Sequence, residues 1–161
     1  MYKRILAPTD GSDLSAAAER AAIDFARANG SAIVALAVAQ PYLPTTAIDG
    51  AVAIDPAIEA ETLMLEANRH VERIAAAARA AGVACTTVAT IAHSASQAIL
   101  EHAGKHGCDL IFMATHGRRG LTRLLLGSVT QDVLAASTVP VLVLRPQGKP
   151  GAAAQAGTPS P

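Results

Sequence analysis

Five short apolar runs, separated by stretches with helical spacing, constrain the fold of this 161-residue chain more than any other feature. The runs are rich in valine, isoleucine and leucine and do not alternate with polar residues, which is typical of strands buried on both faces of a parallel sheet. The stretches between them repeat apolar residues every three or four positions, as amphipathic helices do. The expected strands span about 2–8, 32–40, 83–91, 109–114 and 139–145, and the expected helices span 13–29, 56–82, 95–106 and 129–137. This alternation predicts a doubly wound α/β sheet.

Residues that cap helices support these boundaries. Asp55 followed by Pro56 has the form of an N-cap and a first helical residue. Gly82 is the expected C-terminal cap of the same helix. The segments Ser94–Gln97 and Ser128–Gln131 have the form of capping boxes, so each serine is expected to precede a helix.

Two segments fall outside this pattern. Residues 41–55 form an expected loop of about 15 residues, long enough for a lid or a mobile surface. Residues 147–161 are low in complexity, so we expect a disordered tail after a single domain over 1–146.

Composition excludes several classes of function. The 13 Lys and Arg balance the 13 Asp and Glu, and only 2% of residues are aromatic, so a nucleic-acid-binding surface is not expected. The longest apolar runs are far shorter than the roughly 20 residues of a membrane-spanning helix, and the N-terminus lacks the pattern of a secretory signal. We therefore expect a cytoplasmic protein with Cys85 and Cys108 as free thiols in the core.

Ligands of open α/β sheets bind at the carboxyl ends of strands, where the strand order reverses. After the first strand comes Asp10, whose carboxylate can accept hydrogen bonds from a ribose or an exocyclic amine. After the fourth strand come Gly117 and Gly120, which permit close approach of a ligand. These residues favour a nucleotide whose base lies near the first two strands and whose phosphates follow the glycine loop.

The segment after the glycine loop adds groups that suit phosphate. Gly127 and Ser128 open a helix, whose free N–H groups attract anions, and Arg118, Arg119 and Arg123 can neutralise phosphate charge. The same residues also fit plainer roles, as a helix cap, turn residues and solvated surface. Neither a dinucleotide-binding nor a P-loop motif is present.

Three segments resemble the universal stress protein family. They are Lys3–Ser12, Met113–Thr130 and Val139–Val143, and the resemblance covers residues 2–146. The ATP-binding branch of that family carries glycine, two residues, glycine, nine residues, then Gly-Ser or Gly-Thr. Gly117 and the pair Gly127–Ser128 match this pattern, whereas Ala114 replaces the first glycine.

The resemblance implies a three-layer fold of the adenine nucleotide alpha hydrolase type, with a five-stranded parallel sheet in the order 3-2-1-4-5. It also implies ATP, accompanied by Mg²⁺, between the loops after the first and fourth strands. The implied binding residues are Pro8, Thr9, Asp10, Val38, Met113, Ala114, His116, Gly117, Arg118, Arg119, Gly120, Gly127, Ser128, Val129 and Thr130.

The last strand bears on assembly. The segment 139–145 is apolar but contains Pro140, which favours an edge strand. An apolar edge needs a cover, and both this argument and the resemblance predict a homodimer through that strand. The alternative is that a helix or the tail of the same chain covers it.

Three hypotheses of function follow. The first is an ATP-binding stress-response or regulatory module with at most slow ATP hydrolysis. The second is an interaction protein of the same fold that has lost ATP through Ala114. The third is a nucleotidyl or phosphoryl transfer enzyme. No catalytic set is evident: His102 and His106 have the i, i+4 spacing of a metal pair without a third ligand, and His116 fits a loop-shaping role better than proton transfer.

Overall fold

The central strand β1 (Arg4–Thr9) organises the sheet in the computed structural model, which describes residues 1–41, 55–114 and 127–145. It pairs in parallel with β2 on one side and with β4 on the other. The five strands follow the order β3-β2-β1-β4-β5, and all pairs are parallel. The chain therefore adopts the predicted α/β fold, including the order 3-2-1-4-5. The strand order reverses between β1 and β4.

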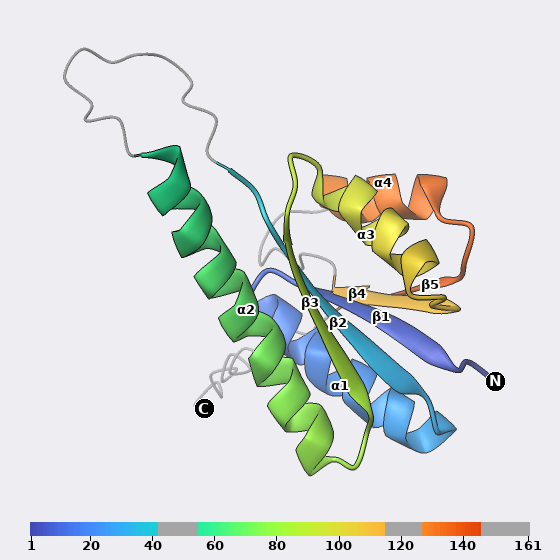
Figure 1. Cartoon of the computed structure of the whole chain (residues 1–161). Coiled ribbons are helices and arrows are strands. Elements are labelled where there is room, and N and C mark those ends of the chain that lie inside the picture. The colour runs from blue at the N-terminus through green and yellow to red at the C-terminus, as the bar shows by residue number, and fades with distance from the viewer. Residues whose placement is uncertain (42–54, 115–126, 146–161) are drawn as a thin grey trace, which may run out of the picture.

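Helices cover both faces of the sheet (Figure 1). The other strands are β2 (Ala32–Ala39), β3 (Cys85–Ile91), β4 (Leu110–Ala114) and β5 (Val141–Leu144), and the helices are α1 (Asp13–Asn29), α2 (Pro56–Ala80), α3 (Ala95–Lys105) and α4 (Ser128–Ala136). Ile5 and Ala7 of β1 pack with α1 and α2, whereas Leu6 packs with α3 and α4. This alternation follows from the two-residue period of a strand, and it produces two apolar cores.

Small side chains dominate the core between α1, α2 and the sheet. On α1, Ala18, Ala22 and Ala26 are buried, and they belong to the same cluster as Ala35 and Ala37 of β2. The spacing of four residues places the three helical alanines on one face of α1. Methyl groups therefore form much of the contact between this helix and the sheet.

The predicted N-caps of α2 and α3 are confirmed. The Asp55 carboxylate accepts a 2.9 Å hydrogen bond from the N–H of Ala57, and the Ser94 hydroxyl accepts one of 3.2 Å from the N–H of Gln97. Gly82 follows Ala81, the C-cap of α2, with a φ of 72°, and the N–H of the next residue, Val83, donates back into the helix. This is the left-handed turn that glycine permits at a helix end.

The predicted cap of α4 is wrong by one residue. Gly127, with extended backbone (φ −57°, ψ 150°), is the N-cap, and Ser128 is already the first helical residue. Its hydroxyl is therefore not placed as a capping acceptor, and Gly127, which has no side chain, makes no side-chain cap hydrogen bond. Within the ranges 1–41, 55–114 and 127–145, the first N–H groups of α4 therefore have no capping side chain.

The last strand, β5, is shorter than the expected 139–145 and lies at the sheet edge. It begins at Val141, because Pro140 has no N–H to donate; the Pro140 carbonyl still accepts a 3.0 Å hydrogen bond from Ile111. β5 pairs with β4, and its four apolar residues are each half-buried.

The structure also bears on the expected thiols, membrane spans and terminal segments. Cys85 and Cys108 are free thiols, and burial raises the pKa of Cys108 to about 11. In the described parts of the chain, no helix combines the length and apolar character needed to cross a membrane. The expected loop 41–55 lies almost wholly, and the tail 147–161 wholly, outside the described residues.

The two ends of α2 differ in burial, which predicts different responses to the same substitution. The side chain of Ile74 is 1% exposed, whereas Ile58 of the same helix is 59% exposed. Ile74→Ala is expected to lower the free energy of unfolding by about 2–5 kcal/mol, because it leaves a cavity. Ile58→Ala is expected to change it by less than about 0.5 kcal/mol. Urea denaturation of both variants measures this, and equal losses would contradict the assigned packing of α2.

Candidate functional site

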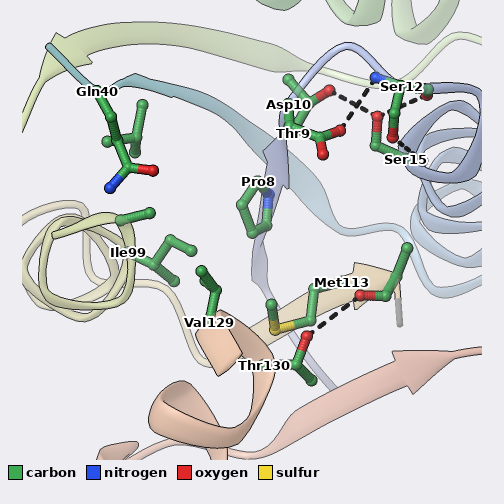
Figure 2. Close-up of a pocket in the computed structure, with 13 residues that line it drawn as sticks. Pro8, Thr9, Asp10, Ser12, Ser15, Gln40, Ile99, Met113, Val129 and Thr130 are labelled. Carbon is green, nitrogen blue, oxygen red and sulfur yellow. Dashed lines mark hydrogen bonds between the residues drawn. The ribbon is translucent and has the colours of Figure 1, made fainter. Parts of the chain in front are cut away.

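A pocket of about 220 Å³ lies where the strand order reverses, at the carboxyl ends of β1 and β4 (Figure 2). This is the position at which open α/β sheets bind their ligands. The first turns of α3 and α4 close the side opposite the loop after β1. Its lining comprises Pro8, Thr9, Asp10, Ser12, Ser15, Val38, Gln40, Ala95, Ile99, Met113, Ala114, Val129 and Thr130.

The loop after β1 forms the polar wall of the pocket. The Thr9 hydroxyl accepts a 3.0 Å hydrogen bond from the N–H of Gly11, and the Asp10 carboxylate accepts one of 3.0 Å from the N–H of Ser12. The Ser12 hydroxyl in turn caps α1 by accepting from the N–H of Ser15 at 3.2 Å. Each turn residue thus bonds to backbone two or three positions ahead, which fixes the loop locally.

Asp10 is the ionisable group of this wall. Burial alone raises the pKa of its carboxyl, but hydrogen bonds from Ser12 and Ser15 outweigh that effect, and the pKa lies below its ordinary value. The carboxylate is therefore charged at neutral pH and exposed enough to accept hydrogen bonds from a ligand.

The opposite wall is apolar. Ile99 of α3 and Val129 of α4 face the pocket beside Met113 at the end of β4 (Figure 2). The Thr130 hydroxyl donates a 3.4 Å hydrogen bond to the carbonyl of Ala114, which joins α4 to the end of β4. A flat, apolar group with polar edges fits between this wall and Asp10.

No lysine, arginine or histidine is among the residues of the described ranges that line the pocket. Among the described residues, the group that suits an anion is the start of α4, where the N-cap Gly127 offers no side chain to the first N–H groups. The described part of the site thus favours the uncharged portion of a ligand.

The structure brings most of the described predicted residues together. Those that line the pocket are Pro8, Thr9, Asp10, Val38, Met113, Ala114, Val129 and Thr130. Gly127 and Ser128 stand at the start of α4 but are not part of the lining. His116, Gly117, Arg118, Arg119 and Gly120 lie outside the described residues, as does Arg123.

Sequence reasoning missed the contributions of Ser12, Ser15, Gln40, Ala95 and Ile99. Gln40 directly follows β2, so the rule about carboxyl ends of strands could have found it; its side-chain amide donates a 2.9 Å hydrogen bond to the carbonyl of His93. Ala95 and Ile99 are one helical turn apart on α3. Nothing in the sequence signals which face of α3 reaches the pocket.

The histidines outside the pocket do not form a metal centre within the described ranges. His102 and His106 stack with ring centroids 5.7 Å apart, and no group of three or more His, Cys, Asp or Glu residues could hold a metal ion in that part of the chain. His70 of α2 instead packs against the backbone of Gly11.

The class of protein follows from the fold and from sequence relatives. The model of the universal stress protein family matches residues 1–145, so the chain belongs to that family. The chain is 34% identical over 147 residues to the universal stress protein MJ0531 of Methanocaldococcus jannaschii, covering 90% of this chain and 83% of that protein. It is 30% identical over 149 residues to YxiE of Bacillus subtilis, covering 90% and 100%.

Solved structures agree with this assignment. The structure of MJ0577, also from M. jannaschii, has a TM-score of 0.71 and 28% identity, covering 92% of this chain and 99% of that one. A universal stress protein in complex with cAMP gives a TM-score of 0.66 at 22% identity, covering 89% and 97%. One from Archaeoglobus fulgidus in complex with dAMP gives 0.61 at 19%, covering 88% and 97%. The last two show likeness of fold, and their ligands are those proteins' own.

The contact between Gly11 and His70 generates a prediction. Gly11 has a φ of 76°, and a Cβ added to it would lie 2.3 Å from Nε2 of His70. Gly11→Ala is therefore expected to cost about 1–3 kcal/mol of stability, through backbone strain and the clash. In a double-mutant cycle, His70→Ala should recover the part due to the clash. A Gly11→Ala variant as stable as the parent in urea would refute both contributions.

Proposed function

We propose that the chain binds an adenine nucleotide, ATP in the first instance, in the pocket between β1 and β4, and acts as a regulatory nucleotide-binding module. The observation that carries this proposal is a pocket with a polar and an apolar wall that lies at the reversal of strand order, beside the start of α4.

The nucleoside end fits the described walls. An adenine ring is flat and apolar on its faces, which suits Met113, Ile99 and Val129, and its exocyclic amine and the ribose hydroxyls are donors, which suits the Asp10 carboxylate. The complexes of relatives with cAMP and dAMP support the choice of an adenine nucleotide.

The phosphate end is assigned to the start of α4. Its first N–H groups carry partial positive charge, and no side chain of the described residues caps them. The motif residues Gly117, Gly127 and Ser128 and the arginines Arg118 and Arg119 of the preceding segment support the same placement through the family resemblance.

A divalent cation would accompany the triphosphate. Within the described ranges no cluster of His, Cys, Asp or Glu could form a cage for a metal ion. Mg²⁺ bound through phosphate oxygens, with most of its waters retained, fits a site of this kind.

The proposal predicts that filling the pocket abolishes binding. Ala114→Leu adds bulk at the end of β4, where the residue lines the pocket. It is expected to weaken Mg-ATP binding by at least about tenfold, a loss of about 1.4 kcal/mol, as measured by isothermal titration calorimetry. Ala80→Leu, at the exposed far end of α2, is the matched control and should bind as the parent does.

The alternatives give different outcomes in the same titration. No binding at millimolar Mg-ATP would favour an interaction protein that has lost the nucleotide through Ala114. Turnover above about 1 s⁻¹ would favour a transferase or hydrolase, because that rate lies in the usual range of enzymes.

We also propose that β5 mediates a homodimer. The strand is apolar and half-buried at the sheet edge, where a second copy would cover it.

A homodimer through β5 should be disrupted by a charged side chain in that strand. Val141→Lys places a charge on the edge strand and should shift the protein from dimer to monomer at micromolar concentration, as measured by analytical ultracentrifugation. Val88→Lys, in the opposite edge strand β3, is the control and should leave the mass unchanged. A parent protein that sediments as a monomer would overturn the proposal.

A further inference from the structure

A buried carboxylate lies behind the polar wall of the pocket. Glu19 of α1 has a side chain that is 8% exposed. It is not part of the pocket lining. A buried charge is costly unless it is paired and hydrogen-bonded, so its partners indicate what it does.

One partner is the last residue of β1. The Thr9 hydroxyl donates a 2.5 Å hydrogen bond to Oε1 of Glu19. Because the same hydroxyl accepts the N–H of Gly11 at 3.0 Å, its only proton and one lone pair are both committed. Glu19 thereby fixes the side chain of Thr9, and Thr9 is the residue at which the turn that carries Asp10 begins.

The other partner comes from α2. Nη2 of Arg73 lies 3.1 Å from Oε1 and 3.2 Å from Oε2 of Glu19. The Arg73 side chain is 48% exposed, so water screens the ion pair and its direct contribution to stability is small. What the pair provides is a fixed position for the Glu19 carboxylate.

The face of α2 that carries Arg73 also contacts the loop 9–12 directly. His70 precedes Arg73 by three residues, so both lie on one side of the helix, and the His70 ring packs against Gly11. The described residues that line the pocket include none from α2. This helix therefore reaches the site through the loop 9–12, by way of Glu19 and Gly11.

We propose that Glu19 and Arg73 are positioning residues that set the geometry of the loop 9–12, and with it the affinity of the pocket for nucleotide. This inference rests on the proposed function for its second half. Arg73 orients Glu19, Glu19 holds Thr9, and Thr9 fixes the turn that presents Asp10. Coupling of this kind is reciprocal, so bound nucleotide should in turn stabilise the docking of α2.

The test compares two arginines of α2 in the full-length protein. Arg73→Met is expected to raise the Kd for Mg-ATP by about tenfold, within the range of coupling between sites. Arg69→Met removes the same charge one turn earlier, from an exposed residue without an ion pair to any described residue, and should change Kd by less than about twofold. Arg73→Lys keeps the charge and should restore most of the affinity.

A double-mutant cycle with Glu19→Gln tests the order of contacts. Glutamine keeps an oxygen that can accept from Thr9 but loses the negative charge that pairs with Arg73. The double variant should therefore bind Mg-ATP no more weakly than Arg73→Met alone, because the two changes remove one interaction. Fully additive losses in affinity would overturn the proposal.

A second measurement separates positioning from simple stabilisation. Melting temperatures are recorded for every variant, and Kd is measured where each is folded. A lower melting temperature for Arg73→Met with an unchanged Kd would mean that the pair only holds α2 in place, and would overturn the proposal.

The positioning role can also be tested if the protein does not bind nucleotide. If the parent does not bind Mg-ATP, the proposed function fails, and the amide resonances of Asp10, Gly11 and Ser12 in the ¹⁵N-labelled protein decide the positioning role. These resonances should shift in Arg73→Met and not in Arg69→Met. Unchanged resonances in both variants would overturn the inference.

Discussion

The parallel pairing of β1 with a strand on each side is the constraint on which the structure depends. Because both neighbours run in the same direction as β1, every connection must cross over the sheet, and helices come to cover both faces. The backbone of β1 pairs with β2 on one side and β4 on the other, and its apolar side chains are buried on both faces of the sheet. The chain therefore leaves β1 at the edge of the sheet where β4 also ends. The pocket lies there because the helices on either side of the reversal diverge.

The placement of charge within this frame is uneven. The described pocket wall carries one carboxylate, Asp10, while a second carboxylate, Glu19, is buried behind it and joined to the cation of Arg73. Asp10 lines the pocket and Glu19 does not, although they are only nine residues apart. The difference arises because Asp10 lies in the turn after β1, whereas Glu19 lies on α1, two helical turns further on and facing back toward Thr9.

The sequence predicted those parts of the structure that local periodicity determines. The apolar runs located every strand, and the order of the sheet followed from the resemblance to the universal stress protein family. The cap of α4 was misplaced because adjacent residues Gly127 and Ser128 both suit that position, and only the backbone decides between them. The pairing of Glu19 with Arg73 was not predictable, since it depends on the register of α1 against α2. Within the site, the residues of β1 and β4 were anticipated from motifs, whereas those of α3 carried no signal.

The many alanines between α1 and the sheet have a consequence for how this protein can change. An alanine loses no rotameric freedom on burial, so this interior forms at low entropic cost. Because Ala22 and Ala35 are fully buried in this layer, a larger side chain at either position would force the helix and the sheet apart. In this layer, substitutions that enlarge a side chain should therefore be the ones that the protein tolerates least. In interiors built from leucine and phenylalanine, substitutions that shorten a side chain are the costly ones.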